Sequence, residues 1–113
     1  MKIDISTHGS FRVLKIHEEL QVISELSELR ILIEGYIKMG VKKIAVCFTE
    51  SSYIYSGAIG VLVHCFKQVM NEGGEFCIIE PQESLASVLE TTGVARIMKI
   101  YPSSSDLPGQ EED

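Results

Sequence analysis

Residues 50–71, ESSYIYSGAIGVLVHCFKQVMN, decide how the rest of the chain is organised. The first part of this stretch is a polar loop rich in hydroxyl groups, which tightens at Ser56-Gly57-Ala58. The second part repeats apolar residues at helical spacing, which predicts an amphipathic helix over about residues 57–72. Free backbone N–H groups and the positive end of the helix dipole at such a junction favour an anion or a polar partner.

The predicted helix has one apolar and one polar face. The apolar face, which we expect to enter the core, consists of Ile59, Leu62, Val63, Phe66, Val69 and Met70. The polar face consists of Gly60, His64, Lys67, Gln68 and Asn71. Ala58, Val61 and Cys65 fall beside the apolar face and widen it toward the helix start, where an exposed edge would serve as a contact surface.

The residues before this stretch predict a hairpin and a helix. Alternating apolar residues predict strands over 2–7 and 11–17, and the Gly-containing turn between them indicates a β-hairpin. Apolar residues at helical spacing predict a helix over 24–39, with Ser24 as the N-cap and Gly40 just after its C-terminus. Residues 43–48, KIAVCF, are almost wholly apolar, which is typical of a strand covered on both faces.

The residues after the central helix predict two more strands and a third helix. Residues 75–80, EFCIIE, form the next expected strand, and Pro81 opens a short helix that ends near Gly93. Residues 94–101 are expected to form a last strand or an extended edge. The element order is therefore β-β-α-β-α-β-α-β. It predicts one α/β domain, a mixed sheet of about five strands with helices packed against it.

Length, charge and hydropathy narrow the class of protein. A chain of 113 residues predicts a single domain, which we assign to residues 1–101, followed by an acidic and frayed tail at 102–113. The net charge is −6, but residues 1–105 carry 12 acidic against 10 basic residues and no basic stripe, which argues against nucleic-acid binding. No apolar run approaches the ~18 residues of a membrane span, and the N-terminus lacks a signal-peptide core, so we expect a cytoplasmic protein without membrane insertion.

The reactive residue types form no catalytic or metal-binding pattern. The three cysteines lack CxxC spacing and lie in apolar runs, so we expect buried side chains in a reducing compartment: Cys47, Cys65 and Cys77. The three histidines lack ligand spacing: His8, His17 and His64. No nucleophile, base and orienting group come together in the sequence. We therefore expect no enzyme activity, no catalytic residue, no metal and no cofactor.

The element order, together with residues 55–79, YSGAIGVLVHCFKQVMNEGGEFCII, and residues 85–101, LASVLETTGVARIMKIY, resembles the STAS domain. This is the family of bacterial anti-sigma-factor antagonists and sulfate-transporter tails, and the resemblance covers about residues 3–101. Its most specific part is the loop-helix junction, where the family typically has Asp-Ser-Ser-Gly-Leu-Gly-Val-Leu. The present chain has Tyr55-Ser56-Gly57-Ala58-Ile59-Gly60-Val61-Leu62.

The resemblance implies a phosphorylation switch. In antagonists with the full motif, the anti-sigma factor is a serine kinase that phosphorylates the second serine and so breaks the complex, and a phosphatase restores binding. That position is Gly57 here, which has no hydroxyl, whereas Ser56 matches the first serine. The family's nearby aspartates match Tyr55, Cys47 at the end of a strand, and Gln21 before the first helix.

Two functional interpretations follow for Ser56. Either Ser56 has become the phospho-acceptor, or the domain docks to a kinase-type anti-sigma factor without a switch at this loop. A simpler alternative is that Ser56 only caps the helix, which is worth ~1 kcal/mol. The expected docking surface consists of Ser52, Tyr53, Tyr55, Ser56, Gly57, Ala58 and Val61. Two further functions stay open: a nucleotide-sensing STAS module and a non-catalytic subunit of a transport complex.

Overall fold

The computed structural model describes residues 3–16, 23–48, 56–81 and 83–108. Within these ranges the predicted order of strands and helices is confirmed, with one additional short helix and one 3-10 turn. The elements are β1 (Ile3–His8), β2 (Phe11–Ile16), α1 (Ile23–Lys38), β3 (Lys43–Phe48), α2 (Ser56–Asn71), β4 (Glu75–Ile79), α3 (Glu83–Thr91), α4 (Val94–Ile97), β5 (Lys99–Tyr101) and the 3-10 helix η1 (Ser104–Asp106).

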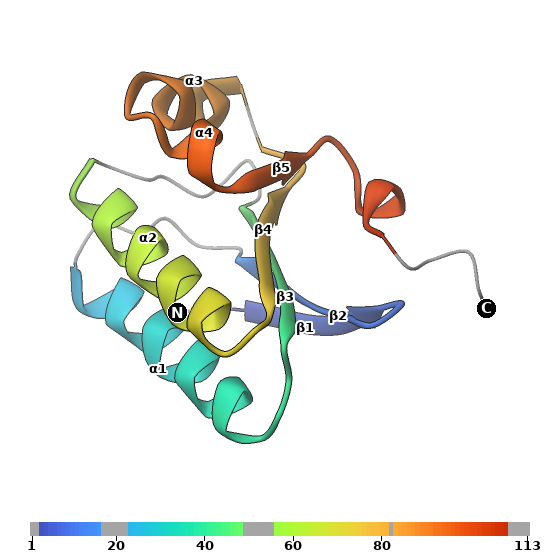
Figure 1. Cartoon of the computed structure of the whole chain (residues 1–113). Helices are drawn as coiled ribbons and strands as arrows, with labels where there is room; N and C mark the ends of the chain where they lie inside the picture. The colour runs from blue at the N-terminus through green and yellow to red at the C-terminus, as the bar shows by residue number, and fades with distance from the viewer. Residues whose placement is uncertain (1–2, 17–22, 49–55, 82, 109–113) are drawn as a thin grey trace.

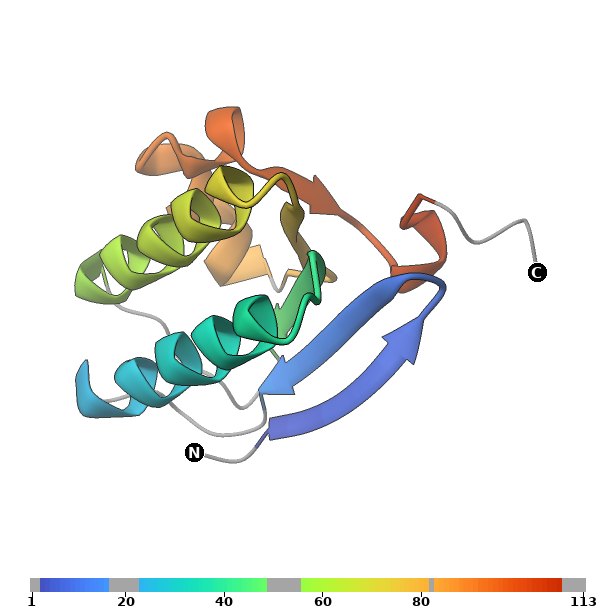
Figure 2. The same cartoon turned by 60° about the horizontal axis from the view of Figure 1, so that its bottom comes forward.

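The five strands form one mixed sheet in the order β1-β2-β3-β4-β5. β1 runs antiparallel to β2, as the predicted hairpin requires, and the other neighbours are parallel. β3, β4 and β5 follow one another across the sheet in the same direction, each beside the strand that precedes it in the chain. Right-handed crossovers therefore place α1, α2 and α3 on the same face of the sheet, as Figures 1 and 2 show.

Glycines end the two long helices where the sequence predicts. Gly40 and Gly73 have φ values of 89° and 77°, a left-handed conformation in which glycine has no Cβ penalty. The N–H of the next residue then donates back into the last turn, from Val41 to the Tyr36 carbonyl at 2.9 Å. At the other end of α1, the helix begins at Ile23, so Ser24 lies in its first turn and not at the predicted N-cap.

The main core lies between the sheet and the helices. It contains the buried side chains of the α1 and α2 stripes together with one side of each central strand, including Leu29, Ile33, Ile44, Val46, Leu62 and Ile78. Met70 differs from the predicted pattern, because it is 48% exposed, whereas Cys65 is fully buried as expected. Because α2 also packs on α1, its buried stripe is turned toward α1 and away from Met70.

The second face of the sheet carries a smaller apolar cluster, which contains Phe11, Val13, Ala45, Cys47, Cys77, Ile79 and Leu107. β3 is therefore covered on both faces as predicted, but the helices cover only one of them (Figure 1). On the other face the described cover comes from the chain after β5. Leu107 is 2% exposed there, directly after the η1 turn.

Two predictions for the C-terminal third were wrong. Residues 94–97 form α4 and not the start of a strand, because Val94 and Met98 are both buried one helical turn apart and the Met98 N–H donates to the Val94 carbonyl at 3.0 Å. Residues 102–108 were expected to be frayed, yet they form η1 and place Leu107 on the sheet. The acidic residues 109–113 lie outside the described ranges.

Candidate functional site

The predicted docking surface lies at the start of α2. Ser56 is the first residue of this helix, one residue earlier than predicted, and Gly57, Ala58 and Val61 follow on the same helix. Their side chains, and Ser52, Tyr53 and Tyr55 entirely, lie outside what the structure describes. The first turn of α2 contains no acidic residue, so the chain does not neutralise the positive end of this helix dipole from within the turn.

The start of α2 lies at the same edge of the sheet as the ends of the parallel strands (Figure 1). β3 ends at Phe48, immediately before the loop that leads to α2, and β4 ends beside it at Ile79. The structure thus places Ser56, the first residue of α2, at the edge of the sheet where the parallel strands end.

Glu80 adds a carboxylate to this edge. It directly follows β4 and has a φ of 51°, the one positive value among the described non-glycine residues. One carboxylate oxygen lies 3.8 Å from the Cys47 thiol, which donates to it, and the other accepts from the backbone N–H of Ser104 at 3.3 Å. The Glu80 N–H donates to the Tyr101 carbonyl at 2.8 Å. Glu80 therefore ties the ends of β3, β4 and β5 together.

The contact with Glu80 changes the chemistry of Cys47. Burial raises the pKa of the Cys47 thiol, and the negative charge of Glu80 raises the pKa further, while Lys15 lowers it. Glu80, which directly follows β4, therefore places a carboxylate beside Cys47 near the end of β3. Reasoning from the sequence missed Glu80. The available signal was an acidic residue between the buried strand β4 and Pro81.

The interface between α1 and α2 contains a polar contact in an apolar setting. The Gln68 amide donates to the Glu34 carboxylate at 3.2 Å, and Arg30 approaches the same carboxylate oxygen at 4.0 Å. The Gln68 carbonyl oxygen is buried without a described partner. Burial raises the pKa of the nearby Cys65 thiol to about 12, and Glu34 adds to this shift. The thiol is therefore protonated and unreactive at neutral pH.

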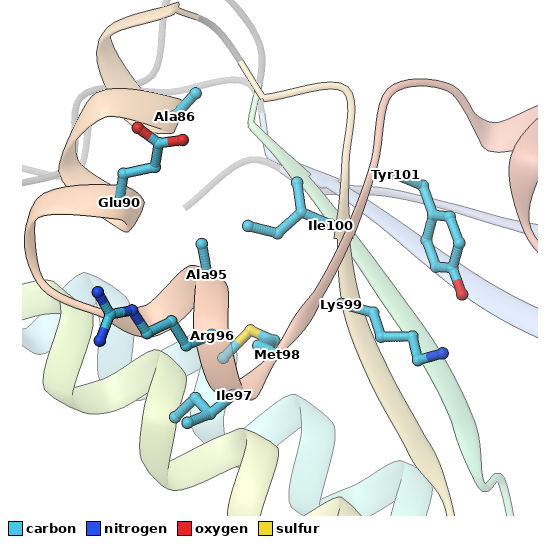
Figure 3. A pocket seen from close by; sticks show the side chains of 9 residues that line it. All are labelled: Ala86, Glu90, Ala95, Arg96, Ile97, Met98, Lys99, Ile100 and Tyr101. Carbon is cyan, nitrogen blue, oxygen red and sulfur yellow. The ribbon is translucent and has the colours of Figure 1, made fainter.

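A concave region of about 650 Å³ lies between α3, α4 and β5 (Figure 3). Its charged residues do not converge on one point. Ile100 points toward α3, whereas Lys99 and Tyr101 project from the opposite side of β5, and Glu90 and Arg96 extend in different directions. In the described ranges, no three His, Cys, Asp or Glu side chains are placed to hold a metal ion.

Among the described helices, none combines the length and the apolar character that a membrane span requires.

The fold and its site edge define a class of protein. The STAS domain family model matches residues 2–107, and the chain therefore belongs to the STAS domain family. The resemblance inferred from the loop-helix junction and the element order is confirmed.

Similar proteins are named as antagonists of anti-sigma factors. A Thermotoga neapolitana protein, described as a homolog of the proposed anti-sigma factor antagonist TM1081, is 30% identical over 81% of this chain and 89% of its own. The crystal structure of TM1081 from Thermotoga maritima superposes with a TM-score of 0.82 at 26% identity, covering 92% of this chain and 89% of that one. Phosphorylated SpoIIAA of Bacillus shares the fold, with a TM-score of 0.62 at 14% identity over 88% and 90% of the two chains.

Proposed function

We propose that this protein is an anti-sigma factor antagonist that binds a kinase-type anti-sigma factor through residues 49–57 and the first turns of α2. The observation that supports this proposal best is similarity along almost the whole chain to proteins named as such antagonists. Binding of this kind would act by mass action, because each anti-sigma factor held in the complex is removed from its sigma factor.

The geometry at the start of α2 is suited to such docking. The helix dipole leaves partial positive charge at Ser56, and its first turn carries no acidic side chain to offset that charge. A partner that offers a carboxylate or a phosphate to these backbone N–H groups would gain charge-assisted hydrogen bonds.

Phosphorylation of Ser56 would reverse this electrostatic preference. A phosphate adds −1.5 to −2 charges, roughly, at pH 7 and would itself occupy the positive end of the helix. The Glu80 carboxylate follows the end of β4, at the same edge of the sheet, and adds negative charge there. A partner surface that is complementary to the neutral loop would then meet a strongly anionic one, and the complex would weaken.

The test combines binding and intact mass. The purified chain is mixed with a candidate anti-sigma factor kinase, with and without ATP, and the complex is followed by size-exclusion chromatography. One added phosphate that is lost in Ser56→Ala, but kept in the exposed control Ser87→Ala, supports the switch. A complex without added phosphate supports docking alone. Absence of any complex with the available kinase-type anti-sigma factors, in both nucleotide conditions, contradicts the proposal.

A gain-of-function variant sharpens the test. Gly57→Ser restores a hydroxyl at the position that the resemblance identifies as the usual acceptor. If the partner is a kinase of that type, Gly57→Ser should take up one phosphate even when Ser56 is replaced by alanine. If the mass of the Gly57→Ser variant does not change on incubation and the complex still forms, the partner binds here without a phosphorylation switch.

A further inference from the structure

A basic concave region lies at the end of the sheet opposite to the docking surface. It measures about 440 Å³ and is lined by residues of the hairpin turn between β1 and β2 and of the turn between α1 and β3. Its lining includes three cationic residues, Arg12, Lys42 and Lys43, together with the hydroxyl of Ser10 and no acidic residue. The other described concave regions of 650, 530 and 500 Å³ each include at least one glutamate.

Backbone geometry brings two of these cations together. Arg12 on β2 lies opposite Ile44 on β3, so Lys42, in the turn just before β3, lies beside the start of β2. The Lys43 side chain projects from the other face of the sheet, where its ammonium lies near the Phe11 ring. The Lys42 carbonyl accepts a hydrogen bond from the Glu75 N–H at 2.7 Å, which ties this turn to the start of β4. Gly9 allows the tight hairpin turn with a φ of 63°. The region is therefore built on paired strands, which hold its lining in place.

Aromatic rings orient two of the three cations. The Arg12 guanidinium lies 4.9 Å above the Tyr36 ring, which is 7% exposed. Such stacking leaves the N–H groups in the guanidinium plane free to donate to a ligand. The Lys43 ammonium lies 5.9 Å from the Phe11 ring and 4.0 Å from a Glu75 carboxylate oxygen, which offsets part of its charge. Arg12 and Lys42 keep an excess of positive charge in a chain whose net charge is −6.

We propose that this basic region binds the phosphate group of a phosphorylated ligand. A planar guanidinium can bind two phosphate oxygens at once, and Lys42 and the Ser10 hydroxyl supply donors from the adjacent turns. A volume of about 440 Å³ is within the usual range of small-ligand sites. The site lies at the amino ends of β2 and β3, roughly 17 Å from the carboxyl end of β3 at 3.3 Å per residue, so its ligand need not displace a partner at the docking surface.

The first arm of the test uses sodium tripolyphosphate. The full chain, labelled with ¹⁵N, is titrated at roughly 20 mM salt, where screening of exposed charges is weak. The expected result is saturable shifts of the amide signals of Gly9, Ser10, Lys42 and Lys43. Lys42→Gln should weaken binding, which raises the dissociation constant by roughly 3- to 10-fold. The exposed lysine Lys67 on α2 provides the matched control, and Lys67→Gln should leave the constant unchanged.

A second variant separates charge from geometry. Arg12→Lys keeps the positive charge and removes the planar fork, so it should weaken tripolyphosphate binding while the melting temperature confirms that the domain is folded. Citrate, compared at equal ionic strength, should bind more weakly than tripolyphosphate. Equal binding of citrate would overturn the assignment to phosphate. Equal weakening of binding by Lys67→Gln and Lys42→Gln would show that only the net charge of the protein matters, which would overturn the proposed site.

The second arm distinguishes a free ligand from a lipid headgroup. Vesicles of phosphatidylcholine with and without a phosphatidylinositol phosphate are sedimented with the chain. Cosedimentation that requires the phosphorylated lipid and is lost in Lys42→Gln identifies a headgroup as the source of the phosphate. Saturation by tripolyphosphate without cosedimentation identifies a free phosphorylated molecule. Failure to saturate in the first arm together with no cosedimentation in the second refutes the proposal.

Discussion

Replacing Leu107 with alanine tests whether the chain after β5 is part of the domain. Leu107 is 2% exposed and packs on the cluster that contains Phe11, Val13 and Ile79. Truncating a buried leucine to alanine costs roughly 2–5 kcal/mol, because the transfer free energy of the side chain is lost and a cavity is left behind. Because Leu107 lies at the margin of its cluster, where the segment can collapse, we expect a loss of about 2 kcal/mol.

Equilibrium unfolding in urea measures this loss. With a denaturant slope of about 2 kcal/mol/M, the unfolding midpoint of Leu107→Ala should fall by about 1 M. The melting temperature should fall by about 8 °C at this chain length. Ile97→Ala is the matched control, because Ile97 is also a large aliphatic residue but is 51% exposed, and its change should stay within about 0.5 kcal/mol. Equal and small effects of the two substitutions would refute the packing of Leu107 on the sheet.

Two further predictions concern glycine packing and thiol burial. A Cβ on Gly74 would overlap the Lys42 carbonyl oxygen, so Gly74→Ala should destabilise the domain by more than about 2 kcal/mol in urea. Gly60→Ala meets nothing within 4 Å and should stabilise α2 by about 0.5–1 kcal/mol. Burial raises the pKa of Cys65 and Cys77 to about 12 from the ordinary 9.0, so the unfolded chain loses these protons first. Stability should be unaffected by these thiols below pH 9 and fall as the pH rises from 9 toward 12, less steeply when both cysteines are replaced by alanine.

Much of the fold could be predicted because local patterns and tertiary packing agree. The run KIAVCF matches β3 at both ends, and Gly40 and Gly93 lie just after α1 and α3 with the left-handed φ values that favour glycine. These signals are local: they depend on period, turn chemistry and helix ends, all of which are present in a few consecutive residues.

The sequence predicted where in the chain the candidate site lies, but not all of the residues that meet there. The loop-helix junction identified Ser56 and its neighbours, and the structure places Ser56 at the start of α2. It did not identify Glu80, because the contact of Glu80 with Cys47 joins residues 33 positions apart across two strands. A spacing of that length has no periodic signature. Only the packing of β4 beside β3 brings the Glu80 carboxylate to Cys47.

The sequence by itself determined the class of fold, the order of its strands and helices, and the family to which the chain belongs. Tertiary structure alone decided what lies on the second face of the sheet. Because every crossover is right-handed and the strands are added in one direction, all the long helices lie on one face, and an apolar surface remains on the other. The short polar segment after β5 covers part of that surface through Leu107, a single apolar side chain whose burial no local pattern could predict.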